Sequence, residues 1–128
     1  MDETEKKFRF RAFPLYKDAR KLNTGLREFS LQVFPAEEKF CLTIQLWRAL
    51  DSIVLNIAEG SDRGTDKDFA HFLNTAHTSL NEVVACLDIS LDNSYITQEQ
   101  HQAFLERCAA LANQLTAFRR VLLRQPTK

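Results

Sequence analysis

The sequence predicts an all-α fold, an antiparallel up-down-up-down four-helix bundle with a left-handed twist. In four separate segments, apolar residues recur at alternating steps of four and three, which is the period of a buried helix face and not of a strand. The first segment shows this period with Leu15, Ala19, Leu22, Leu26 and Phe29. The chain holds only three glycines and three prolines, so the helices should be long. Short connections between the segments favour antiparallel neighbours.

The 128 residues should form a single domain, residues 1–128. We expect an N-terminal arm and four long helices, over residues 1–13, 14–33, 41–60, 66–92 and 98–124. Pro14 suits a first helical turn, where its missing N–H would be unpaired in any case. Thr65 with Asp68, and Thr97 with Gln100, are typical capping pairs. Gly60 should end the second long helix in the left-handed conformation that glycine adopts without strain.

The charge of the chain is balanced, with 17 basic and 17 acidic residues. This balance argues against a strong general attraction to nucleic acid. Antiparallel packing, however, brings the arm and the end of the last helix to the same end of the bundle, where Asp62, Asp66 and Asp68 dilute the positive charge. The cations gathered there are the candidate nucleic-acid contacts: Lys6, Lys7, Arg9, Arg11, Arg119, Arg120 and Arg124.

Within the arm, residues 6–13 interleave cations with Phe8, Phe10 and Phe13. Such a segment could bind phosphates with its cations and stack bases on its rings. The rings could equally hold the arm against the bundle while the cations face solvent. We favour the second interpretation, and the two are compatible.

A polar stripe runs along the second long helix, which is otherwise apolar nearly all round. Its members follow one another at steps of three, four, four and three, which places them on one helical face: Gln45, Arg48, Ser52, Asn56 and Glu59. Polar groups on a buried helix are costly unless they satisfy one another. The stripe therefore marks either an internal network or a working surface at an interface. We expect Arg48 to pair with Glu82 on the next helix.

The same helix carries more apolar surface than one buried seam requires. Ile44, Trp47, Val54 and Ala58 lie away from that seam and would face water in a lone bundle. Burial against another subunit explains such a second apolar face, and we expect these four residues to form a subunit interface. The alternative is a helix that sits unusually deep in a monomeric bundle.

The three cysteines, Cys41, Cys86 and Cys108, are widely spaced and lie among apolar neighbours. This favours buried free thiols in a reducing compartment over a disulfide. The sequence shows no apolar signal segment and no run long enough to cross a bilayer. We therefore expect a cytoplasmic protein that does not enter membranes.

The sequence contains no recognisable catalytic motif. His71, His77 and His101 lack a metal-ligand spacing, and there is no phosphate loop or activated nucleophile. The sequence thus predicts no catalytic residues, no metal, no cofactor and no small-molecule substrate. An unrecognised enzyme built on Arg48, Glu59 and Glu82 is a remote alternative.

Several motifs resemble a known family. FPAEEKF at 34–40, QLWRALDS at 45–52 and NIAEGS at 56–61, followed by DFAHFL at 68–73 and AHTSLNE at 76–82, are similar to the four-helix-bundle proteins encoded in intervening sequences of bacterial 23S ribosomal RNA genes. The similarity covers roughly residues 15–120. The accessory variability protein of diversity-generating retroelements is similar in fold.

The resemblance implies a small cytoplasmic bundle that assembles into a ring, with a homopentamer favoured, and it implies no enzymatic activity. The chain departs from the family pattern at Val54, where proline is usual, and at Trp47, where a second cation is common. The expected function is therefore a non-enzymatic oligomeric scaffold, with RNA or DNA binding through the basic end as a candidate role. The alternative is an adaptor for a protein partner with no nucleic-acid role.

Overall fold

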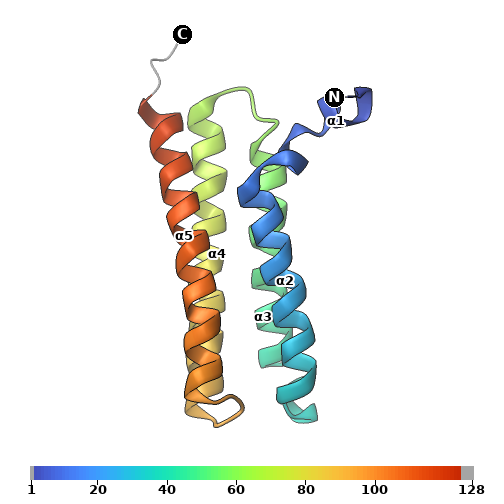
Figure 1. Ribbon diagram of the computed structural model, residues 1–128, viewed down its shortest axis with the longest axis vertical. Coiled ribbons are helices and arrows are strands. Elements are labelled where there is room, and N and C mark those ends of the chain that lie inside the picture. Colours follow the sequence, from blue (N-terminus) through green and yellow to red (C-terminus); the bar gives the residue numbers. More distant parts are fainter. Residues whose placement is uncertain (1, 125–128) are drawn as a thin grey trace.

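The structure is a computed structural model that describes residues 2–124, and the part it describes is all helical, without strands (Figure 1). The elements, in chain order, are α1 (Glu3–Lys7), a 3-10 turn (Arg9–Ala12), α2 (Pro14–Val33), a second 3-10 turn (Ala36–Glu38), α3 (Leu42–Gly60), α4 (Asp66–Asp92) and α5 (Gln98–Arg124). The predicted all-α bundle is confirmed. Each long helix begins and ends within one residue of its expected range, while the expected domain, residues 1–128, extends beyond the described residues at both ends.

The long helices alternate in direction and stand side by side (Figure 1). Contacts join α2 to α3, α3 to α4, α4 to α5 and α5 back to α2, so each helix has two neighbours around a common core. Most core residues lie on the apolar period of the helices, and Leu50, Ala70, Cys86 and Ile96 are buried in addition. Core residues with no exposed surface include Leu26, Ile57, Leu73, Val83 and Leu115.

The expected capping pairs are formed. The Thr65 hydroxyl accepts the backbone N–H of Asp68 at 3.1 Å and starts α4. Thr97 and Gln100 bond each other reciprocally, with 2.9 Å from the Thr97 N–H to the Gln100 side chain and 3.1 Å from the Gln100 N–H to the Thr97 hydroxyl. These bonds satisfy backbone donors that a helix start leaves unpaired.

The expectation for Gly60 is wrong, because no glycine among the described residues has a positive φ. Gly60 is the last residue of α3, is buried, and faces α4. A Cβ at this position would lie 2.6 Å from the Cβ of Phe72, which is closer than packed atoms allow. Glycine is needed here for close helix approach rather than for a left-handed turn.

Aromatic contacts hold the N-terminal arm against the bundle. The Phe10 ring lies 4.9 Å from the Tyr16 ring, and the Phe13 ring lies 5.6 Å from the Phe118 ring on α5. Phe8 contacts only Phe10 among the aromatic rings of the described residues, and 49% of its surface is exposed. The interpretation of the arm as a pinned segment is therefore confirmed for Phe10 and Phe13 but not for Phe8.

The thiol prediction is right for two of the three cysteines. Cys86 and Cys108 are buried and free, whereas Cys41 is exposed. Cys41 directly precedes α3, at a connection where its side chain is not enclosed between helices. Among residues 2–124, no helix is both long and apolar enough to span a membrane.

Candidate functional site

The polar stripe of α3 is divided by the packing of α4. The hydroxyls of Ser52 and Ser79 are 2.7 Å apart, and the Asn56 amide donates to the backbone carbonyl and the hydroxyl of Ser52 at 2.8 and 3.1 Å. Ser79 lies on α4 and is buried. This part of the stripe is an internal network that joins two helices, and Ser79 was not named among the expected site residues.

The other members of the stripe face solvent. Gln45, Arg48 and Glu59 are exposed, as is Glu82 on α4, and none of their side chains forms a hydrogen bond or ion pair within the described residues. The expected Arg48–Glu82 pair is therefore wrong. A helix turns about 100° per residue, so Arg48 is rotated about 40° around α3 from Ser52. This rotation directs the long Arg48 side chain away from α4 and into solvent.

The most complete polar network lies instead between α2 and α3, and we call it the Arg27–Asp51 cluster. It consists of Asn23, Arg27, Ser30, Trp47 and Asp51. Nη2 of Arg27 donates to both carboxylate oxygens of Asp51 at 2.7 and 2.8 Å, and its Nε donates to the Asn23 carbonyl at 2.9 Å. The Asn23 amide in turn donates to Asp51 at 3.0 Å. Every partner is a side chain of the same chain.

These contacts determine the ionisation of Asp51. Partial burial would raise the pKa of its carboxyl, but the hydrogen bonds from Asn23 and Arg27 and the positive charge of Arg27 outweigh it and hold the pKa below its ordinary value of 3.8. A sequence signal for the cluster exists. Asn23 and Arg27, and likewise Trp47 and Asp51, stand four residues apart on their helices and so share a face.

Trp47, one of the four residues expected at a subunit interface, belongs to this cluster. The indole N–H of Trp47 donates to the Ser30 hydroxyl at 3.0 Å, and the Arg27 guanidinium lies 4.6 Å from the centre of its ring. Trp47 and Val54 are half-buried, and both pack against the core of their own bundle. Ile44 and Ala58 are half-buried. The most exposed large apolar side chain of α3 is Leu55, at 63%, which is not among the four expected interface residues.

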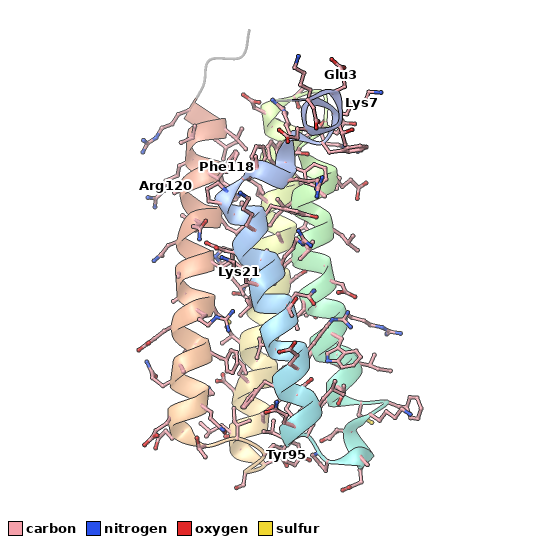
Figure 2. The ribbon with its side chains drawn as sticks, turned by 45° about the vertical axis from the view of Figure 1, so that its right-hand side comes forward. Glu3, Lys7, Lys21, Tyr95, Phe118 and Arg120 are labelled. Carbon is pink, nitrogen blue, oxygen red and sulfur yellow. The ribbon has the colours of Figure 1, made fainter. Side chains whose placement is uncertain are left out.

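The seven candidate cations lie at one end of the bundle, as expected. Figure 2 shows Lys7 on the arm and Arg120 on α5 at the same end, and Tyr95 at the other. Two of the seven contact backbone carbonyls: Arg119 donates to Ala70 at 3.3 Å and Arg9 to Ser61 at 3.4 Å. Among residues 2–124, only one of the seven cations lies within ion-pair distance of a carboxylate: Lys6, which is 4.0 Å from Glu3.

A cleft of about 480 Å³ opens between the arm and the α3–α4 turn, and we call it the arm cleft. The arm contributes Lys6, Lys7, Phe8, Arg9 and Phe10, and the far wall contributes Ala58, Glu59, Ser61, Asp62 and Arg63. The Arg63 guanidinium lies 4.7 Å from the centre of the Phe72 ring. The arm cleft thus combines cations with aromatic surface.

The opposite end contains two polar contacts of a different kind. The Tyr95 hydroxyl donates to the Glu38 carboxylate at 2.8 Å, and Nε2 of His101 lies 2.8 Å from the Asp88 carboxylate. Within residues 2–124, no three metal-ligating side chains come together.

Comparisons with known proteins agree with the fold. A family model described as 23S rRNA-intervening sequence protein matches residues 11–117. A crystal structure of a protein of unknown function from the S23 ribosomal protein family of Bacteroides thetaiotaomicron is similar, with a TM-score of 0.70 and 23% identity over 80% of this chain and 95% of that one. At this identity the likeness concerns the fold alone. No curated protein matches the chain.

Proposed function

We propose that this chain, which belongs to the family of 23S rRNA-intervening sequence proteins, is a non-enzymatic homo-oligomeric scaffold that binds RNA or DNA through its basic end. The observation that carries the proposal is the gathering of seven cations at one end of the bundle, where only Lys6 has a carboxylate within ion-pair distance among the described residues. Unpaired cations are the groups that neutralise nucleic-acid phosphates.

A scaffold role is supported by how the buried polar groups are used. Ser52, Asn56 and Ser79 bond one another across α3 and α4, and Arg27 and Asp51 are engaged across α2 and α3. Groups bound in this way position helices.

Self-association is supported by the outer surface of α3. Leu55 is 63% exposed, and Ile44, which lies eleven residues earlier and so on the same side of the helix, is half-buried. A ring of subunits would cover such a surface, and cyclic symmetry would place every basic end on one face of the ring. A neutral subunit would then present a locally basic surface. The homopentamer is the subunit number implied by the family resemblance.

Nucleic-acid binding can be tested by fluorescence anisotropy with a labelled RNA at several salt concentrations. We expect replacement of Lys6, Lys7, Arg120 and Arg124 by Gln to weaken binding and to reduce its salt dependence, because each lost phosphate contact lowers the slope by about 0.7–0.9. This set leaves out Arg9 and Arg119, which contact the backbone. Replacement of the exposed cations Lys21, Lys39, Arg48 and Arg107 by Gln is the control with the same change in charge.

Binding that is independent of salt, or that both quadruple variants weaken equally, would refute a role for the basic end. A specific protein partner that stays bound after nuclease treatment, with no RNA or DNA binding, would favour the alternative of a protein-partner adaptor.

Self-association can be tested by light scattering. We expect a mass of several 14.8 kDa subunits and a shift to smaller species for Leu55→Glu. Leu123→Glu is a matched control, because Leu123 is a similarly exposed leucine on α5. A wild-type mass of one subunit would overturn this part of the proposal.

A further inference from the structure

We propose that the arm cleft binds an unpaired nucleotide, with its phosphate on the cations of the arm and its base against Phe8, so that the basic end selects single-stranded over double-stranded nucleic acid. This inference rests on the proposed function and gives it a substrate class. It is carried by the size of the cleft, by its charge and by the exposure of one aromatic ring.

The size of the cleft suits one nucleotide. Pockets for small ligands have volumes of roughly 300–1,000 Å³, and the arm cleft measures about 480 Å³. It is bounded on one side by the arm and on the other by the end of α3 and the turn that follows. Arg9 bridges these walls through its 3.4 Å hydrogen bond to the Ser61 carbonyl.

The charge of the cleft suits a phosphate. Its lining contains the cations Lys6, Lys7, Arg9 and Arg63 against the carboxylates of Glu59 and Asp62. No ion pair joins these cations to these carboxylates in the part of the chain that the structure describes. The cations therefore outnumber the carboxylates and keep donors for phosphate oxygens.

Phe8 supplies the aromatic surface. Phe10 and Phe13 already hold the arm against the bundle, through Tyr16 and Phe118 respectively. Phe8 meets Phe10 edge to face, with centroids 6.5 Å apart, and leaves half of its surface exposed at the cleft. Anchoring therefore does not require an exposed ring at position 8.

Base stacking accounts for that exposure, because every base has a flat face that an aromatic ring can cover. In a duplex both faces of each base are already covered by neighbouring base pairs. Only an unpaired base can stack on Phe8, and the preference for single strands follows.

The test compares a labelled single-stranded RNA with the fully paired duplex of the same sequence, by anisotropy at fixed salt. We expect the wild type to prefer the single strand, and Phe8→Leu to weaken single-strand binding about 5- to 150-fold, the range observed for loss of one stacked base. Phe8→Trp, which keeps an aromatic face, should retain binding. Phe40→Leu is the matched control, because Phe40 is an exposed phenylalanine at the opposite end of the bundle.

The outcomes separate this inference from the proposed function. If the protein binds RNA with salt dependence but Phe8→Leu behaves like Phe40→Leu, or the duplex binds as tightly as the single strand, the inference is overturned and the basic end retains its role. If neither RNA binds, both proposals fail. Circular dichroism of Phe8→Leu and Phe40→Leu shows whether each variant keeps its folded state. Phe8→Trp tests the need for an aromatic ring without relying on the leucine variants.

Discussion

Arg27 on α2 holds Asp51 on α3 through both carboxylate oxygens, 2.7 and 2.8 Å from a single guanidinium nitrogen. The same guanidinium covers the ring of Trp47. Apolar side chains alone tolerate several alignments of two helices, whereas this set of bonds forms in only one of them. We infer that the Arg27–Asp51 cluster sets the position of α2 on α3.

Replacement of Asp51 by Ala should lower the free energy of unfolding by about 1 kcal/mol, measured by urea denaturation. Hydrogen bonds to a charged group contribute about 1.5–3 kcal/mol when buried, and the partial exposure of this pair reduces the effect. Asp62→Ala, at an exposed carboxylate outside any ion pair of the described residues, is the control and should change little. Equal losses for the two variants would contradict the role of the cluster.

The stabilisation from Asp51 should depend on pH in a definite direction. The pKa of Asp51 is lower in the folded protein than its ordinary value of 3.8, so the unfolded chain takes up the proton first. The difference in stability between wild type and Asp51→Ala should be complete above about pH 5 and should diminish as the pH falls below 3.8. A difference that grows on acidification would show that the sign is wrong.

Alanine should have opposite effects at two glycines. At Gly60 its Cβ would lie 2.6 Å from the Cβ of Phe72, and we expect Gly60→Ala to destabilise the protein by about 1–3 kcal/mol through overpacking. At Gly64 a Cβ would meet nothing within 4 Å and φ is not positive, so Gly64→Ala should stabilise by about 0.4–1 kcal/mol. Thermal denaturation of both variants measures the contrast, and a stabilised Gly60→Ala would refute it.

Tyr95 should ionise at unusually high pH. Its hydrogen bond to the Glu38 carboxylate, which exists only while the phenol keeps its proton, raises the pKa of Tyr95 above 10.0, and burial and the charges of Glu38 and Glu37 act in the same direction. The contribution of this bond to stability is present below pH 10 and is lost as the pH rises through the raised pKa.

Ultraviolet titration of phenolate absorbance can follow Tyr95 alone in a Tyr16→Phe background, since the chain has two tyrosines. Glu38→Gln in the same background should bring the pKa down. If the pKa of Tyr95 were the same with and without the Glu38→Gln change, the Tyr95–Glu38 hydrogen bond would not form in solution.

The three cysteines should differ in reactivity. Burial raises the pKa of Cys108 to about 11, and burial together with the negative charge of Glu82 raises the pKa of Cys86. Because thiolates are the reactive species, a disulfide reagent at pH 8 should modify Cys41 rapidly and the other two only as the protein opens. The fast phase should disappear in Cys41→Ser. A fast phase that persists in this variant would contradict the burial of Cys86 and Cys108.

The helix bounds follow from local patterns in the sequence. The apolar period and the capping pairs at Thr65 and Thr97 depend on contacts within a few residues along the chain, and local hydrogen bonding is the same whatever lies beyond. The bounds of α2, α3, α4 and α5 could therefore be predicted, and so could the gathering of the basic residues at one end, which follows from short connections and alternating helix direction.

The partner of each helix face, in contrast, depends on how the helices pack. The indole of Trp47 bonds Ser30 on α2, and Arg48 faces solvent instead of pairing with Glu82. Gly60 does not end α3 in the expected left-handed conformation, and it permits the close approach of Phe72. Each of these outcomes depends on the rotation and spacing of two packed helices, which helical periodicity does not specify.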